Sequence, residues 1–303
     1  MKAFETKVFG KWILAGEHAV LRGSPALVFP LRSRSLQLRF EPDVTLNSLE
    51  LLLSGEHGDE YALLFWGVMD RAFAMKKMNR SDWKGRVHLQ CEIPIGGGLG
   101  ASAALCSAVT RWLMHEEVVH ENESLEFARQ LENLFHGESS GVDVAVALSG
   151  QAVKYTRGFT PQKLDIHFEP CLCISYSGVR GVTADCVKKV KELLQKDPEK
   201  GLAIDLRMKE SSLACEAILT SEWGSHSEER LINAINKARD CFQEWGLIEG
   251  ELAEHMRLLK EKGALAVKPT GSGQGGYVLS LWPEEIINKG PDQSLKKILI
   301  PCF

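Results

Sequence analysis

The sequence predicts an α+β protein of two domains, and three observations support this expectation. The first ninety residues consist mainly of strand-like segments, rich in apolar and β-branched positions. Helix-like and strand-like segments then alternate along the rest of the chain. The 303 residues, 44% hydrophobic and 25% charged, have an ordinary globular composition and can form one large or two medium domains. We expect two, residues 1–169 and 170–303.

The first half is expected to begin with strands and then to interleave them with helices. Apolar and β-branched runs predict strands at 2–9, 12–15, 26–29, 35–40, 49–53 and 87–93. Helical periodicity predicts helices at 59–77, 102–115 and 124–135. The last of these helices has a continuous apolar stripe and is expected to end at Gly137, because glycine commonly follows the last turn.

The second half repeats the mixed pattern. Strand-like sequence is expected at 150–168, 171–176 and 277–282. Helices are expected at 183–195, 203–220, 227–243 and 251–262.

Charge and composition favour a small-molecule partner. Lysine and arginine total 36 against 40 acidic residues, so the net charge of −4 offers no general attraction to nucleic acid or to anionic membranes. The N-terminal residues lack the apolar core of a signal peptide, and no apolar run reaches the roughly 18 residues of a membrane span. We therefore expect a cytoplasmic protein. The eight cysteines are scattered in apolar segments, which favours reduced core thiols over disulfides or a metal–thiolate site.

A glycine run between a strand and a helix is the most informative motif. Residues 94–104 read Pro-Ile-Gly-Gly-Gly-Leu-Gly-Ala-Ser-Ala-Ala. Glycines let the backbone approach a bulky anion, and the first N–H groups of the following helix have no partners within the helix. The run predicts a phosphate cradle, with a flexible connection as the alternative. It matches neither the Walker motif nor the dinucleotide fingerprint. A second glycine cluster, 270–276, is either a hairpin turn or another phosphate loop.

Two carboxylates and an N-terminal segment complete the candidate site. Two roles are open for Glu132: it is either an Mg²⁺ ligand or a solvated glutamate on a helix face. Asp143 enters an apolar stretch and therefore needs a partner, for which a lysine is the nearest candidate type; the alternative is a helix cap. Lys11, Glu17 and His18 are polar residues in an otherwise apolar, glycine-punctuated segment, which is unusual for plain core.

In this order and spacing, the four segments resemble the GHMP kinase superfamily of ATP-dependent small-molecule kinases. Residues 10–20 are similar to its first motif, 94–104 to its second and 268–276 to its third. Within the superfamily, 16–20 and 136–143 are most similar to the mevalonate kinases. The resemblance implies a two-domain fold: a ribosomal protein S5 domain 2-like N-terminal domain that binds ATP and an α/β-plait-like C-terminal domain, with the active site in the cleft between them.

The resemblance also implies roles for individual residues. Asp143 would accept the proton of the substrate hydroxyl with Lys11 nearby, and Ser102 and Glu132 would hold Mg²⁺. The ATP phosphates would lie against Pro94, Gly96, Gly97, Gly98, Leu99, Gly100, Ala101, Ser102 and Ala103. The acceptor alcohol would contact Glu17, His18, Arg180, Thr270, Gly271 and Ser272.

The implied reaction is transfer of the γ-phosphate of ATP to the 5-hydroxyl of mevalonate, in isoprenoid precursor synthesis, by a protein that could be a homodimer. The alternatives are a relative acting on a sugar, homoserine or phosphomevalonate, a decarboxylase of the superfamily, and a nucleotide-binding sensor without catalysis. Five residues depart from the family pattern. Ala101 replaces the first of two serines, Gln274 interrupts the third motif and Ser272 replaces the usual alanine of that motif. Val144 follows Asp143 where mevalonate kinases often have Asn, and Glu138 adds negative charge in the loop next to the acceptor.

Overall fold

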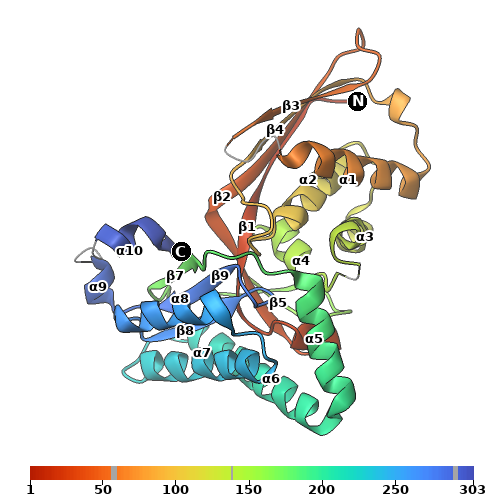
Figure 1. Ribbon diagram of the computed structural model, residues 1–303. Helices are drawn as coiled ribbons and strands as arrows, with labels where there is room; N and C mark the ends of the chain where they lie inside the picture. Colours follow the sequence, from red (N-terminus) through yellow and green to blue (C-terminus); the bar gives the residue numbers. More distant parts are fainter. Residues whose placement is uncertain (56–59, 138, 289–292) are drawn as a thin grey trace. The chain divides into compact units, whose positions relative to one another are not determined.

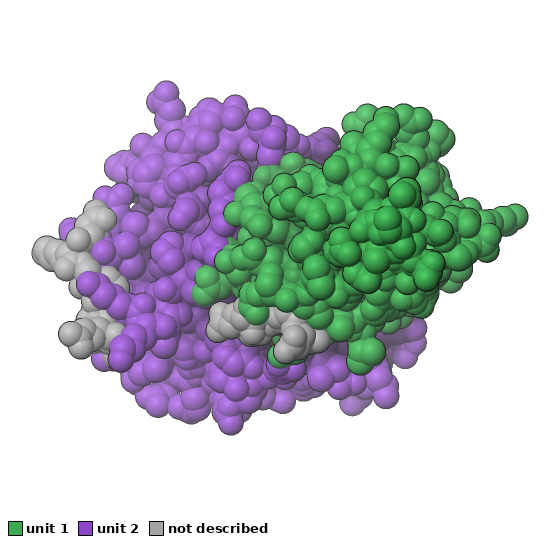
Figure 2. Space-filling model, turned by 90° about the horizontal axis from the view of Figure 1, so that it is seen from above, with its two compact units in different colours: residues 1–11, 34–95, 100–150 green, residues 12–33, 96–99, 151–303 purple. Residues whose placement is uncertain are grey.

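The computed structural model describes residues 1–55, 60–137, 139–288 and 293–303. Strands and helices are mixed in it, as expected for the α+β class (Figure 1). The chain divides into two compact units that interleave along the sequence (Figure 2). Unit 1 consists of residues 1–11, 34–95 and 100–150, and unit 2 of residues 12–33, 96–99 and 151–303. The domain boundary at 169/170 stays a prediction.

Two long strands pass from one unit into the other. They are β1 (Phe4–Ala15) and β2 (Ala26–Pro42), which pair with each other. In unit 1, the C-terminal part of β2 pairs antiparallel with β4 (Gly85–Cys91), from Leu36 opposite Cys91 to Pro42 opposite Gly85. β4 pairs in parallel with β3 (Leu49–Ser54), and a parallel pair needs a crossover connection, which here contains a helix.

Four α-helices complete unit 1: α1 (Tyr61–Lys76), α2 (Ala101–His115), α3 (Ser124–His136) and α4 (Val142–Ser149). Short 3-10 turns lie at Arg80–Asp82 and Glu121–Glu123. α2 packs against each of the other three helices. Eleven of its fifteen residues are buried, which explains the nearly uninterrupted apolar sequence after the glycine run. This central helix places the end of the glycine run against the core of the unit.

Unit 2 contains a four-stranded antiparallel sheet with the order β10-β7-β9-β8. Its strands are β7 (Leu172–Tyr176), β8 (Ala266–Thr270), β9 (Tyr277–Leu281) and β10 (Ile300–Pro301). Two short strands, β5 (Val153–Tyr155) and β6 (Gln162–Lys163), pair with each other, and β5 pairs with Ala26–Val28 of β2.

The helices of unit 2 lie mainly between β7 and β8 in sequence. They are η1 (Ala19–Arg22), α5 (Thr183–Lys196), α6 (Pro198–Leu219), α7 (Ser227–Glu244), α8 (Gly250–Glu261), α9 (Glu284–Asn288) and α10 (Gln293–Ile298). α6 packs along α7, and both α7 and α8 contact β8. Among the aromatic side chains, the buried rings of Trp12 and Phe29 stack with centroids 4.3 Å apart, and the exposed ring of Phe303 meets both edge-on.

The predicted elements agree best where the helical period is clear. α5, α7 and α8 begin and end within one residue of the expected positions. The expected start of α6 at residue 203 is wrong, because the helix begins at Pro198 with Asp197 as its N-cap, whose carboxylate accepts the Lys200 N–H. The first four expected strands are in fact two continuous strands, β1 and β2. The strand-like stretch 150–168 forms only two very short strands.

The expectation of reduced cysteines is confirmed: all eight are free thiols, and all but Cys171 are buried. Within the described ranges, no helix combines the length and the apolar character needed to cross a bilayer. The cytoplasmic location stays a prediction.

Candidate active site

An ion pair in unit 1 joins the two predicted catalytic residues. The Nζ atom of Lys11, on β1, lies 3.0 Å from Oδ1 of Asp143, in the first turn of α4. The Lys11 side chain is 5% exposed and that of Asp143 is 22% exposed. Asp143 therefore has the lysine partner that its apolar surroundings required. The alternative of a helix cap is wrong, because the N-cap of α4 is Gly141 and no side chain caps this terminus.

Gly100 places this ion pair next to the start of α2. It is the N-cap of α2 and has a φ of 78°, in the left-handed region that favours glycine. A Cβ atom at this position would lie 2.7 Å from Cγ of Lys11, so any side chain here would displace the lysine. The last glycine of the run thus lets Lys11 pass close to the helix N-terminus, whose first N–H groups lack acceptors within the helix.

Glu132 is buried on α3, with 2% of its surface exposed, so the alternative of a solvated glutamate is wrong. The Ser139 hydroxyl donates a hydrogen bond to Oε2 of Glu132. The same hydroxyl accepts the Gly141 N–H at 3.0 Å, at the N-cap of α4. The Ser139 N–H in turn donates to Oδ1 of Asn133 at 2.7 Å. Ser139, which the sequence analysis did not single out, therefore links Glu132 to the helix that carries Asp143.

Burial, and after it the negative charge of Asp143, raise the pKa of Glu132 to about 8. The hydrogen bond from Ser139 and the charge of Lys11 oppose this rise in the pKa. The negative charges of the Glu132 and Asp143 carboxylates disfavour each other, and a bound divalent cation would stabilise both charges. The part of the chain described here holds no cluster of three or more His, Cys, Asp or Glu residues suited to a metal. The single carboxylate of Glu132 nevertheless fits Mg²⁺, which commonly takes one or two protein oxygens beside water and phosphate.

In unit 2, the two glycine clusters pack against each other. A Cβ atom on Gly276 would lie 3.0 Å from the Gly97 carbonyl oxygen, and one on Gly271 would lie 3.7 Å from the Gly98 oxygen. The second cluster connects the antiparallel strands β8 and β9, whose last pair is Thr270 opposite Tyr277. It is therefore a hairpin connection, as one reading of its sequence expects, and it packs on the first glycine loop; a phosphate-binding role of this cluster stays a prediction.

Arg180 lies over the first glycine loop. A Cβ atom on Gly96 would lie 3.3 Å from Cδ of Arg180 and 3.7 Å from its Nη1. Arg180 is exposed, and it forms no ion pair with any residue in the described ranges. An exposed guanidinium beside a glycine loop is well suited to a carboxylate or phosphate group.

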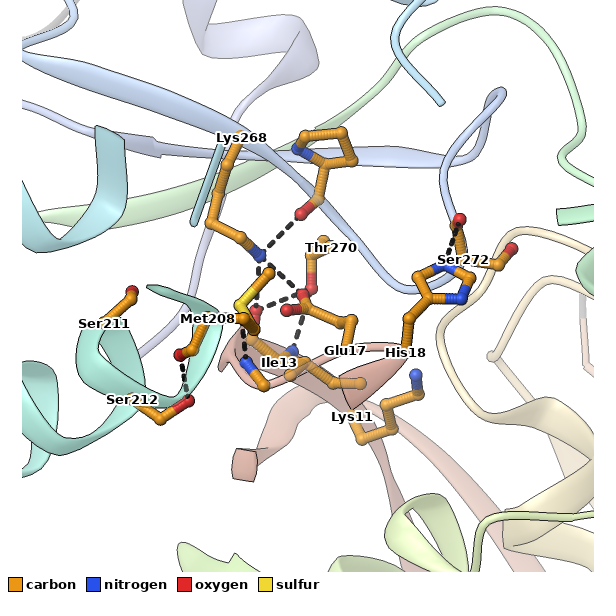
Figure 3. Close-up of polar contacts among 12 residues, drawn as sticks. Lys11, Ile13, Glu17, His18, Met208, Ser211, Ser212, Lys268, Thr270 and Ser272 are labelled. Atoms are coloured by element: carbon orange, nitrogen blue, oxygen red, sulfur yellow. Dashed lines mark hydrogen bonds and ion pairs between the residues drawn. The ribbon is translucent and has the colours of Figure 1, made fainter. Parts of the chain in front are cut away.

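His18 has a strained backbone and a buried ring. Its φ is 59°, which is uncommon for a residue other than glycine. Its Nε2 lies 2.8 Å from the Ser272 carbonyl oxygen (Figure 3), so Nε2 carries the proton. Burial lowers the pKa of His18 to about 4, and the ring is neutral near pH 7. His18 thus ties the segment after β1 to the second glycine cluster.

Glu17 forms a buried ion pair with Lys268 of β8 (Figure 3). Nζ of Lys268 lies 2.5 Å from Oε1 of Glu17 and donates to the Pro269 carbonyl oxygen at 2.6 Å. Two residues further along, the Thr270 hydroxyl accepts the Ile13 N–H at 2.8 Å and donates to the Ile13 carbonyl at 3.0 Å. Lys268 was not predicted as a site residue, although a lysine inside an apolar strand before a glycine cluster was an available signal.

The remaining predicted positions are placed but not tested by these contacts. Leu99, Ala101 and Ala103 are buried, and Pro94 and Ser102 are half-buried. Gln274 has a φ of 54°, and its N–H donates to the Leu247 carbonyl at 2.8 Å, so its backbone takes the left-handed conformation usual for glycine. Glu138 lies outside the described residues. The structure brings together Lys11, Gly100, Glu132 and Asp143 in unit 1, and the glycine loops, Arg180, His18 and Ser272 in unit 2.

Comparison with known proteins finds similarity to one family of kinases in sequence and in structure. Residues 64–151 match the family described as GHMP kinases N terminal domain. The mevalonate kinase of Aeropyrum pernix is 29% identical over 301 residues, covering 93% of this chain and 89% of the relative. The chain is therefore similar to the GHMP kinases over residues 64–151 and to mevalonate kinases over nearly its whole length.

Solved structures of GHMP kinases share the fold. The mevalonate kinase of L. major, solved in complex with R-mevalonate, aligns with a TM-score of 0.80 at 21% identity, covering 98% of this chain and 94% of that one. The phosphomevalonate kinase of Streptococcus pneumoniae, in complex with phosphomevalonate and AMPPNP, aligns with a TM-score of 0.70 at 17% identity, covering 92% of each chain. The expected GHMP kinase fold is therefore confirmed.

Proposed function

We propose that the protein is an ATP-dependent kinase that transfers the γ-phosphate of ATP to the 5-hydroxyl of mevalonate. The observation that carries the proposal is the Lys11–Asp143 ion pair. It lies beside the N-terminus of α2, where Gly100 has no side chain that would displace Lys11. The similarity to mevalonate kinases along nearly the whole chain supports mevalonate as the acceptor.

Phosphoryl transfer requires the protein mainly to position the reactants and to neutralise charge on the phosphate, because its side chains take little part in the covalent chemistry. In the proposed reaction, the carboxylate of Asp143 orients the acceptor hydroxyl and receives its proton as the oxygen–phosphorus bond forms. The ammonium group of Lys11 fixes this carboxylate and adds positive charge where negative charge develops.

The first turn of α2 is the proposed phosphate site. N–H groups at a helix N-terminus point outward with the positive end of the helix dipole, which favours anionic phosphate oxygens. Glu132 and Ser102 are the proposed Mg²⁺ ligands, and a bound Mg²⁺ would neutralise charge on the phosphate oxygens of ATP. We propose that Ser139 keeps the Glu132 carboxylate oriented for this role, because its hydroxyl contacts both Glu132 and the start of α4.

Residues of unit 2 are proposed to recognise the acceptor. Arg180 offers a cation suited to the carboxylate of mevalonate. His18, Thr270, Gly271 and Ser272 would shape the surroundings of the acceptor. We propose that Glu17 acts through the loop it anchors, since its carboxylate is buried and bonded to Lys268. The homodimer implied by the resemblance stays a prediction, which light scattering of the purified protein would check.

The test is ADP release from Mg²⁺-ATP with a panel of acceptors: mevalonate, phosphomevalonate, homoserine, galactose and a blank without acceptor. Turnover with mevalonate alone, with one phosphate appearing on mevalonate for each ADP, supports the proposal. Selective turnover with another member would reassign the acceptor and leave the kinase chemistry in place. ATP binding without turnover on the whole panel would contradict the kinase assignment. Asp143→Asn serves as the chemical control, since it should abolish release that depends on the acceptor.

A further inference from the structure

Arg111 lies on α2 and joins three elements of unit 1 through four hydrogen bonds. Its Nη2 donates to the carbonyl oxygens of Ala147 at 3.1 Å and Leu148 at 2.7 Å. Its Nη1 donates to the Lys7 carbonyl at 3.0 Å and to the Thr6 hydroxyl at 3.2 Å. One guanidinium group therefore fastens α2 both to α4 and to β1.

Each of these contacts lies close to a proposed active-site residue on the same element. Ala147 follows Asp143 by four residues, one turn of α4, and Lys11 follows Lys7 by four residues on β1. α2 itself begins at Ala101, in the proposed phosphate site. The Arg111 side chain thus bonds to the two elements that must hold Lys11 and Asp143 at 3.0 Å from each other.

The hydrogen bonds of Arg111 are chemically suited to hold α2, α4 and β1 in fixed positions. Ala147 and Leu148 belong to the last turn of α4, where carbonyl groups lack partners within the helix and the dipole is negative. A planar guanidinium can serve several carbonyls at fixed angles, which a flexible ammonium group cannot do equally well. Partial burial lowers the pKa of Arg111 from its usual value, yet the group stays charged.

We propose that Arg111 is a positioning residue for the phosphoryl-transfer site, setting the placement of Asp143 on α4 relative to Lys11 on β1. This inference rests on the proposed kinase function. None of the four hydrogen bonds of Arg111 reaches a proposed reacting group; they bind the backbones of α4 and β1 and the Thr6 hydroxyl.

The test compares Arg111→Gln, Arg111→Lys and a matched control, Arg207→Gln. Arg207 also forms two hydrogen bonds that join helices, both of 2.6 Å from α6 to Glu244 of α7, but neither helix carries a proposed catalytic residue. For Arg111→Gln we expect kcat, per folded molecule, to fall about tenfold with KM for ATP within about twofold of the parent. Arg111→Lys should recover part of kcat, and Arg207→Gln should keep the parent kcat.

A second readout needs no turnover. In the ligand-free protein, Arg111→Gln should speed amide hydrogen exchange in α4 and in the segment of β1 around Lys7 by at least about tenfold, leaving α7 unchanged. Arg111→Lys serves the same comparison should the Gln variant fail to fold. A parent-like kcat in both Arg111 variants, or an equal loss in Arg207→Gln, would overturn the inference. Unchanged exchange in α4 and β1 would overturn it independently, even if the parent proved to have no kinase activity at all.

Discussion

At the scale of single residues, the Lys11–Asp143 pair leads to the first prediction. Asp143→Asn keeps the shape of the side chain but removes the proton acceptor and the ion pair. We expect kcat to fall by about a hundredfold or more, the range typical of a lost general base, with ATP affinity within about twofold of the parent. Steady-state kinetics and calorimetric ATP binding would measure both. Asp165→Asn, at a side chain 89% exposed, is the control, and near-normal turnover of Asp143→Asn would remove Asp143 from the mechanism.

The buried carboxylate of Glu132 leads to the second prediction. Its pKa of about 8 means that metal-free Glu132 holds a proton near pH 7, which a bound cation must displace. The apparent Mg²⁺ affinity should therefore rise as the pH increases toward about 8. Glu132→Gln should raise the Mg²⁺ concentration at half-maximal rate about tenfold or more and flatten this pH dependence. Mg²⁺ titrations at pH 6.5 and 8.5 check this, and identical curves for parent and variant would exclude Glu132 as a ligand.

The neutral ring of His18 leads to the third prediction. The folded pKa of about 4 lies below the ordinary value of 6.5, so the unfolded chain takes up a proton first as the pH falls. Between pH 6.5 and about 4, His18 should reduce the free energy of unfolding by about 1.4 kcal/mol per pH unit. Between its ordinary pKa of 4.5 and its folded pKa of about 8, Glu132 makes the free energy of unfolding change with pH in the opposite direction. The total stability of the protein therefore does not report the histidine alone.

The difference in the free energy of unfolding between the parent and His18→Asn isolates the contribution of the histidine. Asparagine tolerates a positive φ better than most residues, so this variant limits backbone strain. Denaturant unfolding at pH 5 and pH 7.5 should show a gap in stability between parent and variant that narrows toward pH 5. A gap that does not depend on pH would contradict the buried, neutral histidine.

At the scale of elements, two separate constraints favour glycine at position 100, before α2: a positive φ and the close approach of Lys11. Gly100→Ala must accept a positive φ and also displace Lys11, whereas Gly158→Ala, at a φ of 83°, has no atom within 4 Å of the new Cβ. Both variants should lose roughly 1–2 kcal/mol of stability from backbone strain. Only Gly100→Ala should also lose kcat, by about tenfold or more. Thermal unfolding and kinetics of the two variants would check this, and an equal kcat in both would show that Lys11 does not depend on Gly100.

At the scale of the whole molecule, the interleaved units bear on the predicted domains. Residues 12–33 belong to unit 2, and the stacked Trp12 and Phe29 contact Phe303. A fragment of residues 1–169 would leave these rings without their partner. We expect it to show no cooperative unfolding transition by circular dichroism and to expose apolar surface to a hydrophobic dye. A cooperative transition in this fragment would instead support residues 1–169 as an independent domain.

The sequence alone determined the α+β class, most of the helices and the chemistry of the candidate site. These features are local: helical periodicity in α5, α7 and α8, and the residue types of the glycine run, can be seen within short windows. The resemblance to the GHMP kinase superfamily could be seen for the same reason, because the motifs of that superfamily are short and each has its own spacing. The need of Asp143 for a cationic partner also followed from its apolar neighbours in sequence.

The tertiary structure decided which residues meet. Lys11 and Asp143 are 132 positions apart, and Glu17 and Lys268 are 251 apart, so no local pattern could pair them. Glu132 could have faced solvent until the packing of α3 on α2 buried it. Ser139 and Arg111 look ordinary in the sequence, because a hydroxyl or guanidinium gains its role only from the acceptors that folding brings to it. Periodicity and residue chemistry are local properties of a chain, whereas burial and pairing depend on contacts between distant segments.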